Sequence, residues 1–101
     1  MISVSIRRKR GRIWAFTVTD HGKTDVCAAV SLLTLNTVNS IEALTGTHFT
    51  CEYDPEGGFL QFEIKEYNPK TDLLLEAMAL GLESVKENYG NDIILTNEEV
   101  N

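Results

Sequence analysis

Cysteine, proline and glycine are scarce in this chain of 101 residues, which contains two, two and seven of them. Two cysteines are too few for the disulfide framework of a small secreted domain, so we expect free thiols. Residues 1–15 hold no uninterrupted apolar segment of the kind found in secretory signals, and we therefore expect a cytoplasmic protein. Because no proline- or glycine-rich linker divides the chain, residues 1–101 are expected to form a single domain.

Long apolar runs are lacking as well. The longest stretch without a charged residue, residues 26–41, contains six serine, threonine and asparagine residues. We therefore predict that this stretch is too short and too polar to cross a membrane. The hydrophobic fraction of 43% is nevertheless sufficient for a buried core, which argues against a disordered or collagen-like chain.

Positive charge is in short supply, and what there is lies near the N-terminus. The net charge of -6 argues against a dedicated nucleic-acid-binding protein. Residues 1–24 hold six basic and one acidic residue, for a net +5, whereas residues 25–101 hold three basic and fourteen acidic residues, for a net -11. We interpret the basic run at residues 7–12 as a charged turn that keeps a sheet edge soluble, with contact to a ribonucleoprotein surface as the alternative.

Two different periods of apolar residues divide the chain into strands and helices. Alternation predicts strands, and steps of three and four predict helices. The order β-β-α-β-β-α-β predicts an α+β fold, a two-layer sandwich with both helices on one face of a mainly antiparallel sheet. We expect strands near residues 2–6, 14–18, 49–53, 60–64 and 92–95, and helices over residues 26–45 and 69–89.

Capping residues and apolar steps define the two predicted helices. Thr24 or Asp25 can cap the first helix and Gly46 ends it, while Asn68 and Pro69 open the second. Residues 26–41 carry no charge, so the first helix must be covered on more than its core face, by a partner subunit, a substrate or both. The expected buried faces are Val26, Val30, Leu33, Ile41 and Leu44 in the first helix, and Leu74, Met78, Val85 and Tyr89 in the second.

The most informative residue is Cys27, which falls in the first turn of the predicted first helix. Unpaired N–H groups at a helix start favour the thiolate, which is the nucleophilic form of cysteine. His21 lies six residues upstream, and the chain between them can bend back far enough to bring imidazole and sulfur together. A cysteine with a histidine base is the minimal equipment for attack on a carbonyl.

Residues 21–31, His-Gly-Lys-Thr-Asp-Val-Cys-Ala-Ala-Val-Ser, resemble the signature of the Prp-type (YsxB-like) ribosomal-processing cysteine proteases. The order of elements and the chain length agree with that family over essentially the whole sequence. The resemblance implies an endopeptidase that removes the N-terminal extension of a ribosomal protein, large-subunit protein twenty-seven. It further implies a homodimer without a metal or organic cofactor.

The same resemblance implies roles for four residues. Cys27 would be the nucleophile and His21 the general base and later acid. Ser31, one helical turn beyond the cysteine, would support them by hydrogen bonding. Asp25 is either a helix cap or a residue that orients the histidine.

The chain departs from the family pattern before the cysteine. Asp20 stands where the family places glycine, and Thr24 stands where it usually places an aspartate. Many members also have several more residues between histidine and cysteine. His21 therefore corresponds either to the catalytic histidine, the reading we prefer, or to a second histidine that some members carry.

Other readings of the polar residues are weaker. Cys27, Cys51, His21 and His48 would make a four-ligand zinc set by number, but without the close cysteine pairs of structural zinc sites. Four glutamates are interpreted as a solvated surface and not as an acid/base pair. The four glutamates are Glu83, Glu87, Glu98 and Glu99.

The alternative function is a non-catalytic, ribosome-associated interaction module that docks through the basic turn.

Overall fold

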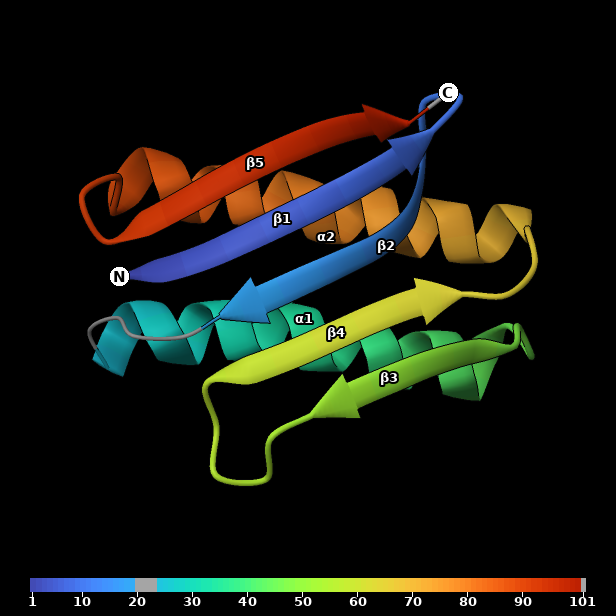
Figure 1. The fold of residues 1–101 in the computed structure, drawn as a ribbon, viewed down its shortest axis with the longest axis horizontal. Helices are drawn as coiled ribbons and strands as arrows, with labels where there is room; N and C mark the ends of the chain where they lie inside the picture. The colour runs from blue at the N-terminus through green and yellow to red at the C-terminus, as the bar shows by residue number, and fades with distance from the viewer. Residues whose placement is uncertain (20–23, 101) are drawn as a thin grey trace.

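The computed structural model describes residues 1–19 and 24–100 as one five-stranded sheet with two long helices. Figure 1 shows both helices on the same face of the sheet, which confirms the predicted two-layer α+β arrangement. In chain order the elements are β1 (Ile2–Lys9), β2 (Arg12–Thr19), α1 (Thr24–Leu44), β3 (Phe49–Tyr53), β4 (Phe59–Ile64), α2 (Pro69–Asn88) and β5 (Ile93–Val100).

The strands lie in the order β3-β4-β2-β1-β5, and only the β1–β5 pair is parallel. β5 runs beside β1 over eight residues, from Ile93 opposite Ile2 to Val100 opposite Lys9. The predicted last strand, residues 92–95, was therefore too short. Residues 96–99 are polar and exposed, so no apolar pattern in the sequence predicts a strand there. They form a strand because their backbone pairs with that of β1.

The core lies between the sheet and the helices. Phe16 of β2 and Phe62 of β4 are fully buried, and their ring centroids lie 5.1 Å apart. Phe49 of β3 approaches Phe62 at the same centroid distance. These three rings join β2, β4 and the edge strand β3.

A β-bulge at Trp14 interrupts the pairing of β1 with β2. Arg7 lies opposite Ala15 and Arg8 lies opposite Ile13, which leaves Trp14 without a partner on β1. Ile13 is consequently buried in the core, while Trp14 is only partly buried. The alternation of Trp14, Phe16 and Val18 in the predicted strand suggests one shared face, but Trp14 does not lie on the core face, because the bulge shifts the alternation by one residue.

α1 buries threonines as well as aliphatic side chains. The Thr34 hydroxyl donates to the Val30 carbonyl at 2.8 Å, and the Thr37 hydroxyl donates to the Leu33 carbonyl at 2.7 Å. These bonds satisfy the hydroxyls and allow both residues to be buried. Leu44 is 67% exposed, which corrects its predicted burial, because it lies at the end of the helix.

By length and composition alone, α1 is apolar enough to cross a membrane over Asp25–Leu44. This differs from the expectation drawn from residues 26–41, because the helix extends beyond that stretch at both ends. One side of α1 packs into the core through Val26, Val30, Val38 and Ile41. A core helix of a folded domain passes the same test of length and composition.

α2 begins as predicted. The Asn68 side chain accepts a hydrogen bond from the Lys70 amide at 2.8 Å, and Pro69 is the first helical residue. Tyr89 is 43% exposed and forms the C-cap, so its predicted burial was wrong. The buried residues of α2 are Thr71, Leu75, Met78, Ala79, Leu82 and Val85.

Candidate active site at the start of α1

Cys27 is the fourth residue of α1, and its side chain is partly buried. Its neighbour Val26 is completely buried, and Cys27 itself packs against the same core cluster. This packing fixes the first turn of the helix on the sheet. The sulfur therefore sits at the end of α1 that carries partial positive charge, the end that favours a thiolate.

Asp25 lies inside the first turn of α1 and does not precede the helix. The helix begins at Thr24, so Asp25 is its second residue. The Oδ1 atom of Asp25 accepts a hydrogen bond from the Val26 amide at 2.9 Å. An acidic side chain in this position satisfies a first-turn N–H group and complements the helix dipole.

His21, the expected base, lies outside the described residues, as does the rest of residues 20–23. Ser31 is described, and it is exposed on α1 one turn after Cys27. It lines a pocket of about 120 Å³ together with Phe59 and residues of the β3–β4 turn. The serine is thus part of a concave surface, which begins on α1 one helical turn after the cysteine.

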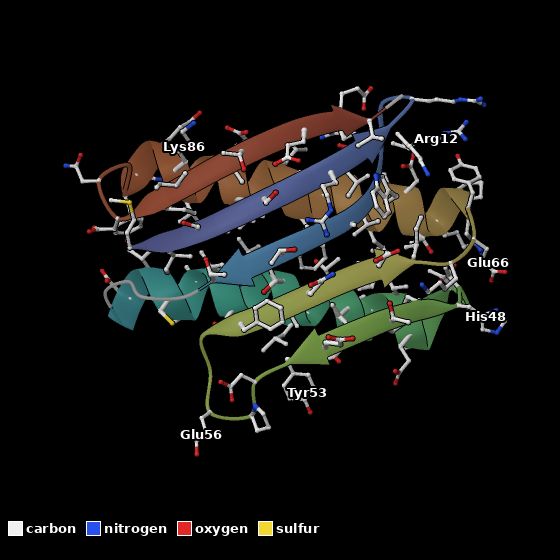
Figure 2. All side chains as sticks on the ribbon, in the orientation of Figure 1. Arg12, His48, Tyr53, Glu56, Glu66 and Lys86 are labelled. Carbon is white, nitrogen blue, oxygen red and sulfur yellow. The ribbon has the colours of Figure 1, made fainter. Side chains whose placement is uncertain are left out.

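A second cavity, of about 670 Å³, continues along the same flank of α1. Both cavities are lined by Leu35 of α1 and by Tyr53, Asp54 and Gly57. We call the two together the α1 groove. One wall is the helix and the other is the turn between β3 and β4, where Figure 2 labels Tyr53 and Glu56. Apolar side chains line this exposed surface, with Leu35 46%, Phe59 38% and Tyr53 64% exposed.

The wall formed by the β3–β4 turn is held by Asp54. Its amide donates to the Phe59 carbonyl at 3.1 Å, and its Oδ1 atom accepts from the Glu56 amide at 2.9 Å. Gly57 and Gly58 have φ angles of 92° and 95°, which glycine adopts without strain. Sequence reasoning found the turn but missed its role in the groove. The only signal was the uncharged face of α1, which required a cover.

The other candidate residues lie on different elements from Cys27. Cys51 of β3 packs against the core and also lines the larger cavity of the α1 groove. Its burial raises the pKa of the thiol, which disfavours the nucleophilic thiolate. His48 is exposed and lies 3.4 Å from Glu66, at the end of the molecule where Figure 2 labels both. Within residues 1–19 and 24–100, no group of His, Cys, Asp and Glu side chains is arranged to hold a metal ion. The four glutamates interpreted as a solvated surface are exposed.

The sequence is similar to known proteases over most of its length. A model of the family described as cysteine protease Prp matches residues 1–94. The ribosomal processing cysteine protease Prp of Bacillus subtilis (strain 168) is 30% identical over 108 aligned positions, which cover 95% of this chain and 96% of the relative. The protein of the same name from Staphylococcus aureus (strain Mu50) is 30% identical over 77 positions, which cover 75% and 73%.

Solved structures agree with the sequence comparison. The ribosomal processing protease Prp from S. aureus, in complex with a covalently linked product peptide, superposes with a TM-score of 0.91 at 28% identity, covering 97% of this chain and all of the other. The same protease with a substrate peptide gives a TM-score of 0.90 at 27% identity, with the same coverage. The protein SMU.848 from Streptococcus mutans gives 0.87 at 27% identity, covering 99% and 96%.

The fold, the helix-start cysteine and the similar structures with bound peptides define a cysteine protease. More narrowly, the chain belongs to the cysteine protease Prp family. The family resemblance of residues 21–31 is thereby confirmed.

Proposed function

We propose that this protease removes the N-terminal extension of a ribosomal protein, large-subunit protein twenty-seven, with Cys27 as nucleophile and His21 as base. The observation that carries the proposal is the position of Cys27, in the first turn of α1 and one helical turn before Ser31, which lines the α1 groove. The names of the relatives, ribosomal processing proteases, support the substrate class.

The proposed reaction has two steps. His21 accepts the proton of the Cys27 thiol, and the sulfur attacks the scissile carbonyl. The tetrahedral intermediate collapses to a thioester as the histidine returns the proton to the leaving amine. Water, deprotonated by the same histidine, then attacks the thioester and releases the acid product and the free thiol. The N–H groups of a helix start are suited to stabilise the oxyanion, although that of Val26 already donates to Asp25.

We propose that the extension lies along the α1 groove with apolar side chains against Leu35, Tyr53 and Phe59. These side chains offer an apolar surface that water covers in the free protein. Ser31 lies between this surface and Cys27 along the helix, where its hydroxyl can bond the peptide backbone. Asp25 serves the first turn through its bond to Val26.

The nucleophile and base are tested by mass spectrometry of a peptide that spans the extension and its mature start. We expect cleavage by the wild-type protein and by Cys51→Ser, which loses the other thiol. Because Cys51 lines the larger cavity of the α1 groove, any change in this variant should be in KM and not in kcat. Cys27→Ser and His21→Ala should each reduce cleavage by several orders of magnitude. Cleavage by Cys27→Ser at the wild-type rate would refute the assignment of the nucleophile, and unchanged cleavage by His21→Ala would move the base elsewhere.

The groove is tested by steady-state kinetics of Leu35→Glu. A charge at this position should raise KM about tenfold or more, because an apolar substrate side chain would then meet a carboxylate. Leu73→Glu is the matched control, since Leu73 is 71% exposed on α2 and lines neither cavity of the groove. Equal KM values for the two variants would show that the substrate lies elsewhere.

We also propose that the protein is a homodimer and acts in the cytoplasm, where ribosomal proteins are assembled. The support for a dimer is Leu32, which is 71% exposed on a helix that carries no charge over residues 26–41. Light scattering should give twice the chain mass for the wild-type protein and for Leu73→Glu, and the chain mass for Leu32→Glu. A wild-type monomer at micromolar concentration would refute the dimer.

A further inference from the structure

β2 and β4 separate at the end of the sheet that carries the β1–β2 hairpin. They pair from Thr19 opposite Phe59 to Ala15 opposite Glu63, and beyond that point no pair joins them. The bulge at Trp14 begins where the pairing stops. A cavity of about 490 Å³ opens between the two diverging strands, and we call it the hairpin pocket. Figure 1 shows the β1–β2 hairpin and the start of α1, which carries Cys27, at opposite ends of the molecule.

The hairpin pocket is positive although the chain as a whole is negative. Four of its lining residues are basic: Lys9, Arg10, Arg12 and Lys65. Its one acidic residue, Glu66, accepts a hydrogen bond from the His48 amide at 3.2 Å and lies 3.4 Å from the His48 ring nitrogen. The pocket therefore gathers nearly half of the nine basic residues of a protein with a net charge of -6. Such a concentration of one sign attracts an anion.

Arg8 belongs to a different environment from its basic neighbours. Its guanidinium forms two hydrogen bonds with the Glu76 carboxylate of α2, at 2.6 and 3.1 Å. These bonds fasten the sheet to the helix layer and raise the pKa of Arg8. Within the described residues, Lys9, Arg10 and Arg12 have no acidic partner. The charge of Arg8 is thus paired with Glu76, whereas the charges of Lys9, Arg10 and Arg12 are available to a ligand.

Two aromatic rings lie among these cations. The Lys9 ammonium is 5.2 Å from the centroid of the Trp14 ring, and the Arg12 guanidinium is 4.0 Å from that of Tyr67. The bulge that moves Trp14 out of the core leaves its buried Nε1–H without a partner among the described residues. A buried N–H group without a partner destabilises the free protein, and such departures from ideal packing are typical of functional sites. Arg10 is a second unfavourable feature of the same region, because it occupies a left-handed turn position, φ 53°, that glycine or asparagine adopts more easily.

We propose that the hairpin pocket binds a segment of single-stranded nucleic acid. Phosphates would lie against the basic residues and a base would stack on Trp14, because such strands present phosphate and planar ring in alternation. An acidic peptide would be bound by the cations alone and would make no contact that requires the rings. The proposal concerns binding and not cleavage. It does not depend on the proposed protease reaction, because the hairpin that carries the pocket and the start of α1 that carries Cys27 lie at opposite ends of the molecule.

Trp14 is the only tryptophan of the chain, so its fluorescence reports directly on the pocket. We expect an unlabelled oligouridylate to quench this fluorescence on binding. Polyglutamate, which carries charge without rings, should leave it unchanged. An oligouridylate that fails to bind at low salt, or that binds without quenching, would overturn the proposal. Uridine monophosphate that binds as tightly as the oligomer would also overturn it, because the ligand would then be a free nucleotide.

Two variants with the same net charge separate a local effect from a global one. Arg10→Asn with Arg12→Gln removes two positive charges from the pocket, and Lys86→Glu changes the charge of α2 by the same two units. Figure 2 shows Lys86 far from Arg12. In fluorescence anisotropy the pocket variant should bind a labelled oligouridylate about tenfold or more weakly, with the salt slope reduced by about 1.4. The α2 variant should bind as the wild type does, and equal losses in the two variants would overturn the proposal.

The base-stacking part is tested by Trp14→Leu, for which the affinity should fall by about five- to 150-fold, the usual range for loss of one stacked base. Trp14→Phe keeps a ring and should restore most of the affinity. Circular dichroism checks that both variants are folded. Cys27→Ala should bind the oligouridylate normally, and the pocket double variant should cleave the peptide normally. A failure of the binding proposal is therefore distinguishable from a failure of the proposed protease reaction.

Discussion

The ring of Phe62 offers a strong test of the structure, because it contacts rings of both neighbouring strands. It is completely buried, and its centroid lies 5.1 Å from those of Phe16 and Phe49. Phe62→Ala removes a full aromatic side chain from the core and two ring contacts with it. Substitutions of this kind cost about 3–5 kcal/mol, and a domain of this size has about 5–15 kcal/mol in total. We expect a loss at the upper end of that range, since the ring lies between two others.

Urea denaturation followed by circular dichroism measures this loss. With a slope of about 1–2 kcal/mol per molar urea, the midpoint should fall by about 2 M or more. Phe59→Ala is the matched control, because Phe59 lies three residues earlier on the same strand and is 38% exposed. It should cost about 1 kcal/mol. Equal losses in the two variants would contradict the placement of Phe62 at the centre of the core.

Three further predictions concern side chains with a defined chemical environment. Burial raises the pKa of Cys51, so its alkylation by iodoacetamide should require a higher pH than that of an ordinary thiol. Peptide mapping across pH measures this, and alkylation of Cys51 at the pH at which an exposed thiol reacts would refute the assignment. Arg10→Asn should raise the free energy of unfolding by about 0.5–1 kcal/mol in thermal or urea melts, because it relieves the left-handed backbone, and a loss would contradict the turn geometry. Glu76→Gln should lower stability by about 1 kcal/mol or less, and less still at high salt, because the ion pair with Arg8 is only partly buried; a salt-independent loss would contradict this reasoning.

The fold was predictable because apolar residues recur with a regular period in most of its strands and helices. Strands such as residues 2–6 alternate strictly, and α2 has both a capping asparagine and a first-turn proline. The errors fall where a distant part of the chain decides the outcome. Residues 96–99 carry no apolar pattern and become strand only by pairing with β1. Leu44 and Tyr89 fit helical steps but lie at helix ends, where the core no longer covers them.

The candidate site, like the fold, could be predicted only in part from the sequence. The position of Cys27 in the first turn of a helix follows from local sequence, because the polar residues before it and the apolar steps after it define the helix start. The α1 groove does not follow from local sequence. Its second wall comes from the turn between β3 and β4, which reaches α1 only through the strand order. Nothing in residues 53–59 indicates which helix they face.

Trp14 shows most clearly what the apolar pattern of the sequence does not determine. Ile13, Trp14, Ala15 and Phe16 are four consecutive apolar residues, so two registers fit the sequence equally well. The bulge opposite Arg7 and Arg8 settles the choice by burying Ile13 and turning the indole toward the basic hairpin. One extra residue in β2 thus changes the largest apolar side chain of the chain from a core residue into the ring of a positively charged pocket. That pocket and the α1 groove share no lining residue, which allows a peptide and a second ligand to be bound at the same time.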